Sequence, residues 1–194
     1  RKFDPERLFS IYNGLDFTPR TPAMNRAEYL RSVGLEADET CVVAGIAARL
    51  NPVKDIATLI RGFAKAHRAF PALRLLIAGD GEEMANLKQL AADLGVAKAV
   101  CFAGWISDTD SFYNALDINT LTSISETFPY ALTEGARAGL PTISSKVGGV
   151  SYLIDHGSNG FLFPPGEDQA LADHLLTLAR DPDLRKTMGQ RLYE

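Results

Sequence analysis

The sequence predicts an α/β fold in which a doubly wound parallel sheet of about six strands carries helices on both faces. Two observations lead to this prediction. Short apolar runs rich in Val, Ile, Leu and Phe have the length and composition of parallel strands that are buried on both faces. Longer amphipathic segments separate these runs, and repeated strand–helix–strand units favour parallel strands joined by helical crossovers.

The predicted strands and helices alternate along most of the chain. We expect strands at Cys41–Ile46, Leu73–Ala78, Val100–Phe102, Ile118–Leu121, Thr142–Ser144 and Gly160–Phe163. The spacing of apolar residues predicts helices at Asp55–Phe70, Glu82–Leu94, Asp110–Ala115, Pro129–Ala138, Asp168–Ala179 and Asp183–Leu192. Pro182 separates the last two helices, because proline interrupts a helix in its interior.

Residues 1–40 are interpreted as a linker and leading segment packed on the domain, and residues 41–194 as the domain itself. Tyr12–Asp16 contains an Asn-Gly turn signal, and Pro19 and Pro22 favour an irregular link. Asn25–Val33 has the pattern of a short helix. The chain does not begin with Met, so we expect a fragment of a longer protein.

The composition is that of an ordinary soluble globular protein, with 46% hydrophobic and 23% charged residues. The net charge of −4 argues against a broad nucleic-acid-binding surface, and no apolar run approaches the roughly 20 residues of a membrane span. Cys41 and Cys101 lie in apolar runs and are expected to be buried free thiols, which fits a reducing, cytoplasmic location. The histidines lack metal-ligand spacing, so no metal site is expected.

Ligands of doubly wound sheets bind at the carboxyl ends of the strands, so the loops that follow the strands are the candidate sites. Arg49 and Lys54 lie on the loop after the first strand, which leads into a helix. Helix N-termini favour anions, and an arginine fork together with a lysine charge can bind a diphosphate. Two solvated surface charges would also explain this spacing.

Pairs of glycines follow the second and the fifth predicted strands. Gly79 and Gly81 form the first pair, and Gly148 and Gly149 form the second. Glycine allows close approach of the backbone, and the second pair suggests backbone close to a ligand or a neighbouring helix. For the first pair, a tight turn between strand and helix is the alternative.

The loop after the third strand contains Gly104 and then Asp108. The carboxylate of Asp108 could cap the next helix by accepting a backbone N–H, or it could face a base. Pairing of this carboxylate with guanine would favour GDP as the nucleotide. The sequence leaves both possibilities open.

Two glutamates flank the start of the helix predicted after the fourth strand. Glu126 lies on the loop and Glu134 lies one to two turns inside the helix, with Pro129 suited to the first turn. Both carboxylates can face one cavity at different depths, with free N–H groups at Thr127 and Phe128 between them. The alternative is that Glu126 interacts favourably with the helix dipole and that Glu134 is solvated.

Taken together, these loops resemble the C-terminal domain of family-four glycosyltransferases, which are retaining enzymes with two facing Rossmann-like domains, the GT-B architecture. The resemblance runs from Tyr12 to about Leu192 and rests on motifs that occur in the family order. These motifs are Tyr12–Asp16, Gly45 with Arg49 and Lys54, Ala78–Gly81, Phe102–Gly104, Glu126 and Glu134 with seven residues between them, Val147–Gly149 and Asn159–Leu162.

The resemblance implies a role for each candidate residue. Arg49 and Lys54 would bind the donor diphosphate and steady the departing nucleotide, while Glu126 would hydrogen-bond hydroxyls of the transferred sugar. Glu134 would hold the ribose hydroxyls. Further donor contacts are expected at Thr127, Phe128, Gly79, Gly81, Ala103, Gly104, Asp108, Gly148 and Gly149. No metal or other cofactor is expected, because the cations and a helix N-terminus would stabilise the developing charge.

Two residues depart from the pattern of the family. Pro129 stands where the family often has glycine, and it removes one N–H donor from the start of the helix. Tyr152 stands where the family usually has glutamate, close to the Gly148–Gly149 loop.

The implied function is that of the donor-binding half of a retaining hexosyltransferase whose donor is a nucleotide-diphospho-sugar with UDP or GDP. An N-terminal domain outside this chain would supply the acceptor site for a polysaccharide or glycolipid, a catalytic histidine and a contact with the inner face of the membrane. The fragment alone should bind nucleotide weakly and transfer nothing. A sugar-nucleotide epimerase half-domain and a non-catalytic nucleotide-binding module are the alternatives. A dehydrogenase is disfavoured, because no Gly-x-Gly-x-x-Gly follows the first strand.

Overall fold

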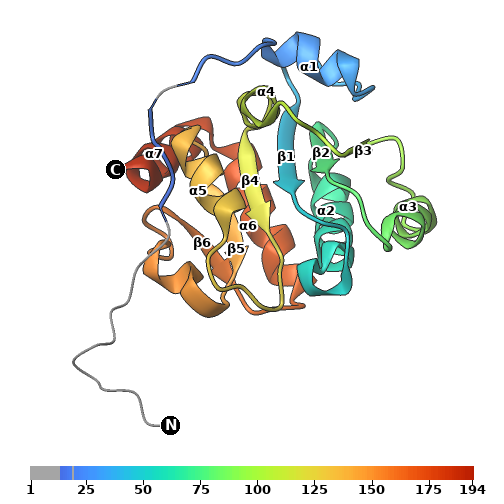
Figure 1. Ribbon diagram of the computed structural model, residues 1–194. Helices are drawn as coiled ribbons and strands as arrows, with labels where there is room; N and C mark the ends of the chain where they lie inside the picture. Colours follow the sequence, from blue (N-terminus) through green and yellow to red (C-terminus); the bar gives the residue numbers. More distant parts are fainter. Residues whose placement is uncertain (1–13, 19) are drawn as a thin grey trace, which may run out of the picture.

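A six-stranded parallel sheet forms the centre of the computed structural model, which describes residues 14–18 and 20–194 (Figure 1). The strands are β1 (Val42–Ala47), β2 (Leu73–Ala78), β3 (Val100–Gly104), β4 (Ile118–Leu121), β5 (Thr142–Ser145) and β6 (Gly160–Phe163). Their order is β3-β2-β1-β4-β5-β6, and every neighbouring pair is parallel. The predicted doubly wound sheet is thus confirmed. Its strand order reverses between β1 and β4, which is where ligands of such sheets bind.

Helices cover both faces of the sheet. They are α1 (Arg26–Ser32), α2 (Ile56–Ala69), α3 (Met84–Asp93), α4 (Thr109–Asn114), α5 (Tyr130–Arg137), α6 (Asp168–Arg180) and α7 (Pro182–Tyr193). The predicted bounds of the helices differ from these by one or two residues. For α1, α2 and α5 the prediction included the capping residue at each end. The sequence patterns did not reveal two 3-10 helices, η2 (Pro52–Lys54) and η3 (Gly148–Tyr152).

The core consists of two main layers, one on each face of the sheet. Alternate residues of β1 point to opposite sides: Ala44 and Ile46 pack with α2, α3 and α6, while Val43 packs with α1 and α4. A smaller cluster lies between β4, α5 and η3.

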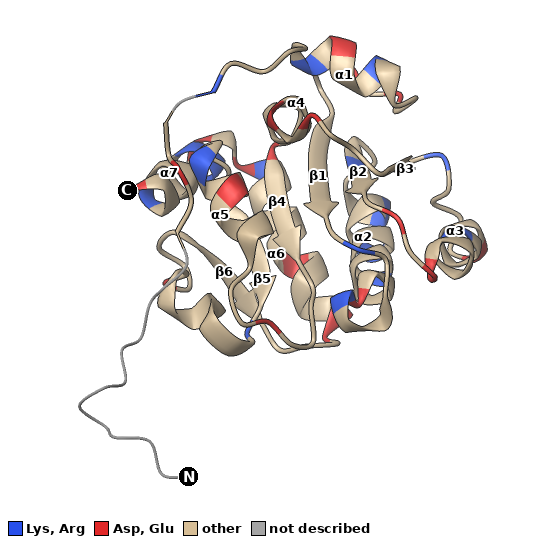
Figure 2. Ribbon diagram, in the orientation of Figure 1, with Lys and Arg blue, Asp and Glu red and all other residues tan. Residues whose placement is uncertain are grey.

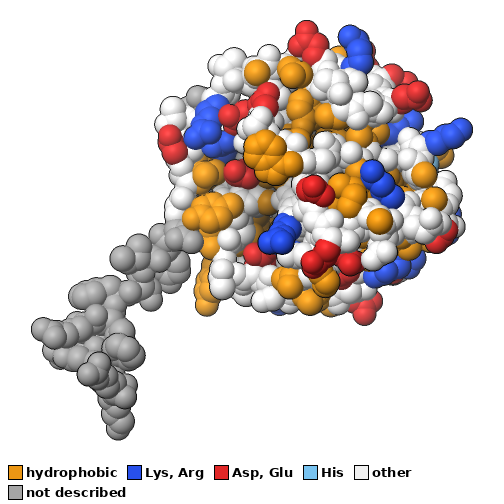
Figure 3. All heavy atoms as spheres, turned by 45° about the vertical axis from the view of Figure 1, so that its right-hand side comes forward, with side chains coloured by type: hydrophobic (Ala, Val, Ile, Leu, Met, Phe, Trp, Pro, Cys, Tyr) orange, Lys and Arg blue, Asp and Glu red, His pale blue; other side chains and the backbone are white. Residues whose placement is uncertain are grey.

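Large hydrophobic side chains also remain exposed, and Figure 3 shows such side chains in separate patches among charged groups on one face. They are Met24, Val53, Trp105, Ile124, Tyr130, Tyr152 and Tyr193.

The two thiols differ in burial. Cys41, directly before β1, is buried as predicted. Cys101 is only half-buried, because β3 lies at the edge of the sheet, and its thiol donates to the carbonyl oxygen of Val33.

Part of the predicted leading segment packs on the domain through Arg26 of α1. The Arg26 guanidinium donates to the carbonyl oxygens of Ala115 at 2.6 Å and Cys41 at 3.1 Å, and to the Asp117 carboxylate at 2.8 Å. The same carboxylate accepts the N–H of Val43 at the start of β1. Residues 1–13 and 19 lie outside the described residues, so the turn predicted at Tyr12–Asp16 and the link at Pro19 are not assessed. The boundary at residue 40 stays a prediction.

Candidate functional site

The candidate site lies on the loops that follow β1 and β4, the two strands beside the reversal of strand order. Figure 2 shows charged positions of both signs on the loops below these strands. The N–H of Ile124 donates to the carbonyl oxygen of Val53 at 2.9 Å, and the Thr122 hydroxyl donates to that of Lys54 at 2.8 Å. These hydrogen bonds hold the two loops side by side.

Lys54 and Glu126 form an ion pair across this junction. The Nζ atom of Lys54 contacts Oε1 of Glu126, and the Ser123 hydroxyl donates to the same oxygen at 2.7 Å. The side chain of Lys54 is 26% exposed and that of Glu126 is 10% exposed. The structure therefore brings these two predicted site residues together, and the side chains of Lys54 and Ser123 hold the Glu126 carboxylate.

The loop before Lys54 has a defined conformation. The Asn51 side chain accepts the N–H of Lys54 and caps η2. Asp55 then adopts a φ of 43°, which is left-handed backbone, and its carboxylate caps α2 by accepting the Thr58 N–H. Left-handed backbone costs a non-glycine residue free energy, and this cap offsets part of that cost. The sequence patterns did not anticipate the 3-10 turn that places Lys54.

Arg49 is exposed at the rim of a hollow of about 450 Å³ at the carboxyl ends of β1, β2 and β3. Its lining residues are Ala47, Ala48, Arg49, Ala78, Gly79, Asp80, Trp105, Ile106 and Thr109. Within the part of the chain that the structure describes, no ion pair includes Arg49. Its guanidinium is therefore open to an anionic ligand.

The first glycine pair packs against the loop after β1. A Cβ atom on Gly79 would overlap with the carbonyl oxygen of Ala48, and one on Gly81 would overlap with that of Leu50. The Leu50 N–H also donates to the Asp80 carbonyl oxygen at 2.9 Å. Both glycines are thus required by contact between two loops of the protein, and only Gly79 lines the hollow beside Arg49.

The second glycine pair supports the loop that carries Glu126. Gly148 has a φ of 47°, and a Cβ atom there would overlap with the carbonyl oxygen of Glu126. A Cβ atom on Gly149 would lie 2.7 Å from the carbonyl oxygen of Thr127, which is also too close. The structure therefore places this pair against the loop before α5, whereas the sequence suggested a ligand or a neighbouring helix.

Residues 126–129 lead into α5. Thr127 is exposed, and the half-buried ring of Phe128 contacts that of Tyr130 edge-on, with 5.2 Å between centroids. Pro129 occupies the N-cap position and not the first turn, and it provides no side-chain cap. The N–H group of Leu132 donates to the carbonyl oxygen of Pro129, so those of Tyr130 and Ala131 remain open to an anion.

Glu134 lies on the side of α5 that faces α4. The Tyr113 hydroxyl donates to Oε2 of Glu134 at 3.0 Å. Burial, together with the negative charge of Glu134, raises the pKa of Tyr113 well above its ordinary value, so Tyr113 stays protonated as a donor. The cavity that Glu134 lines, of about 220 Å³, also contains Arg20 and Arg137 but not Glu126.

Asp108 acts as a helix cap. Its Oδ1 accepts the N–H of Ser111 at 3.0 Å and caps α4, and hydrogen bonds from Ser111 lower the pKa of its carboxyl group. Of the two possibilities that the sequence left open, the structure shows the cap. Ala103 and Gly104 end β3 next to this turn, and the Gly104 carbonyl oxygen accepts the N–H of Gly79 at 2.7 Å.

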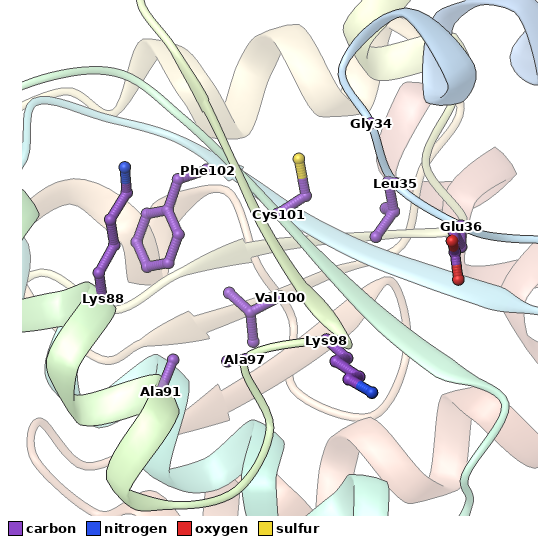
Figure 4. A pocket seen from close by; sticks show the side chains of 10 residues that line it. All are labelled: Gly34, Leu35, Glu36, Lys88, Ala91, Ala97, Lys98, Val100, Cys101 and Phe102. Carbon is purple, nitrogen blue, oxygen red and sulfur yellow. The ribbon is translucent and has the colours of Figure 1, made fainter.

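A larger hollow of about 690 Å³ lies elsewhere, at the exposed edge of β3 (Figure 4). Figure 4 shows it between α3, which contributes Lys88, and the segment that contains Leu35 and Glu36. It contains none of the predicted site residues.

Among the described residues, no cluster of three or more His, Cys, Asp or Glu side chains could hold a metal ion. In the same part of the chain, no helix has the length and apolarity needed to cross a membrane.

Comparisons with known proteins identify the family. The family described as "Glycosyl transferases group 1" matches residues 32–194. The N-acetyl-alpha-D-glucosaminyl L-malate synthase of Bacillus anthracis is 29% identical over 95% of this chain and 48% of its own length. The lipopolysaccharide core biosynthesis glycosyltransferase LpsE of Rhizobium meliloti is 31% identical over 97% of this chain and 52% of its own length. The chain thus spans about half the length of these relatives.

Solved structures agree with this match. Anabaena HepE in complex with UDP-glucose has a TM-score of 0.84 at 30% identity, covering 94% of this chain and 50% of HepE. The C-terminal domain of the group 1 glycosyl transferase LpcC from Francisella tularensis has a TM-score of 0.81 at 26% identity, covering 93% of this chain and 95% of that domain. The chain therefore belongs to the group 1 glycosyl transferases and has the fold of their C-terminal domain.

Proposed function

We propose that this chain is the donor-binding domain of a retaining glycosyltransferase. Together with an N-terminal half, it would transfer a hexose-type sugar from a nucleotide-diphospho-sugar to a polysaccharide or glycolipid. The observation that carries the proposal is the joined pair of loops at the reversal of strand order, where Arg49, Lys54 and Glu126 lie. The names of relatives that act in lipopolysaccharide core biosynthesis support the proposed acceptor class.

The charges of these loops suit a donor diphosphate. Arg49 offers a fork of N–H donors without a competing ion pair, and Lys54 offers a point charge that Glu126 holds in place. The uncapped start of α5 adds backbone N–H groups. These groups would stabilise the negative charge that develops on the departing nucleotide, so the proposal requires no metal ion.

The two glutamates take different parts of the donor in this proposal. Glu126 lies beside Lys54, and its unshared carboxylate oxygen would accept hydrogen bonds from hydroxyls of the transferred sugar. Glu134 would accept hydrogen bonds from the ribose, with Tyr113 fixing the orientation of its carboxylate. Thr127 and Phe128 would offer backbone contacts between the two parts.

We propose UDP as the nucleotide of the donor. HepE, which is similar over most of this chain, has been solved with UDP and with UDP-glucose. Asp108 was the sequence feature that pointed towards guanine, and its carboxylate is engaged in capping α4. A uracil base leaves that cap undisturbed.

Calorimetric titration with UDP, GDP and ADP tests the proposal. We expect UDP to bind more tightly than GDP or ADP, and Lys54→Ala and Glu134→Ala to weaken UDP binding. Lys88→Ala on α3 is a matched control, because Lys88 lines the separate hollow at β3 and should leave affinity unchanged. No heat with any of the three nucleotides at millimolar concentration would contradict donor binding by this chain.

A further inference from the structure

Trp105 is unusually exposed for its side chain. It is the single tryptophan of the sequence and directly follows β3, and 78% of it is exposed. A tryptophan side chain can bury about 150–250 Å² of surface, so leaving it in water forgoes a large hydrophobic stabilisation. Ligand pockets are lined mainly by hydrophobic and aromatic side chains, so an exposed ring beside a hollow marks a candidate binding surface.

The backbone before Trp105 turns the chain away from the sheet. Gly104 has a φ of 70°, a left-handed conformation that favours glycine. Its carbonyl oxygen accepts the N–H of Gly79 at 2.7 Å, which ties the turn to the loop after β2. The position of Trp105 relative to that loop is therefore fixed by the fold.

The hollow beside Trp105 has walls that suit a flat, mostly apolar ring. Small side chains from the ends of β1 and β2, Ala47, Ala48 and Ala78, line it together with Ile106. The charged residues that line this hollow are Arg49 and Asp80. A planar ring could lie against Trp105 while a group attached to it carries a negative charge towards Arg49.

We propose that the indole of Trp105 stacks on the base of the donor nucleotide in this hollow. The inference rests on the proposed function, and it adds a residue that determines affinity for the nucleoside part. Stacking of a base on an aromatic side chain contributes about 1–3 kcal/mol. Arg49 lines the same hollow as Trp105. A nucleoside diphosphate could therefore contact both residues, with its base on Trp105 and its phosphates at Arg49.

Fluorescence offers a direct test, because Trp105 is the only indole in the chain. Saturating UDP should change the emission of the wild-type protein, with the same dissociation constant as calorimetry gives. Trp105→Ala should weaken UDP binding by roughly 5- to 150-fold, the range that corresponds to such stacking. It should leave the affinity for pyrophosphate unchanged, and Trp105→Phe should retain most of the UDP affinity.

Tyr193→Ala is the control for loss of an exposed aromatic side chain, because Tyr193 lies at the end of α7 and outside the hollow. Unchanged emission at saturating UDP, or unchanged UDP affinity in Trp105→Ala, would overturn the stacking while leaving donor binding intact. Equal weakening of UDP and pyrophosphate would also overturn it, because Trp105 would then shape the loop and not contact the base. Failure of the wild-type protein to bind either ligand would instead contradict the proposed function.

Discussion

Replacing Lys54 with Met tests how strongly the ion pair with Glu126 stabilises the candidate site. Met keeps a flexible apolar chain but removes the ammonium group, so the Glu126 carboxylate retains only the Ser123 hydroxyl as a partner. Removing one partner of a buried ion pair costs about 3–5 kcal/mol, whereas an exposed pair contributes about 0–1 kcal/mol. Because Lys54 is 26% and Glu126 10% exposed, we expect the free energy of unfolding to fall by about 2 kcal/mol.

Urea denaturation followed by circular dichroism measures this loss, and urea adds no ions that would screen the pair. Adding Glu126→Gln to Lys54→Met should restore most of the stability, because no unpaired charge then remains buried. Lys65→Met is the matched control: Lys65 is 38% exposed, and its partner Asp168 keeps Arg61 as a second cation. A loss in Lys54→Met no larger than in Lys65→Met, or no recovery in the double variant, would refute this reasoning.

Three further predictions concern other parts of the domain. Gly79→Ala should lower the free energy of unfolding by more than about 3 kcal/mol, because the new Cβ atom would overlap with backbone. Gly157 also has a positive φ but lies in open space, so Gly157→Ala should cost about 1 kcal/mol, and thermal unfolding compares the two variants. Tyr113→Phe should cost about 1 kcal/mol of stability, because one hydrogen bond is lost. If Tyr113 orients Glu134 on the ribose, this variant should also show a smaller preference for UDP over 2′-deoxy-UDP in calorimetry. An unchanged preference would argue against this role. Burial and a neighbouring imidazole lower the pKa of His174, so the folded state disfavours its protonation and stability should fall as the pH drops through about 6.5. His174→Phe should flatten that fall in urea unfolding between pH 7 and pH 5, and an equal slope in both proteins would exclude His174 as its source.

Most of the fold could be predicted because parallel strands buried on both faces leave continuous apolar runs. All six strands were predicted, and β2, β4 and β6 with their observed bounds. The 3-10 helix η2 was missed because three residues carry no periodic pattern, and its geometry depends on the Asn51 cap and the left-handed Asp55. The prediction that Cys101 is buried was wrong, because β3 lies at the edge of the sheet. An apolar run in the sequence does not show whether its strand is central or at an edge.

The candidate site was predicted less completely, since its geometry depends on contacts between distant segments. The pairing of Lys54 with Glu126 joins residues 72 positions apart and requires β1 and β4 to be neighbours. Motif spacing indicated both residues but not their contact. The sequence patterns did not indicate that Tyr113 contacts Glu134 or that Trp105 lines the hollow beside Arg49, because both depend on how distant segments pack.

The loop that carries Glu126 is held from two sides before any ligand arrives. Hydrogen bonds to Val53 and Lys54 hold its first part, and the closely packed Gly148 and Gly149 hold its backbone at Glu126 and Thr127. A ligand that binds such a loop has little conformational entropy left to remove, so its contacts appear almost fully as affinity. The rigidity of this short segment would then add to the effect of its charges on how strongly the domain retains its ligand.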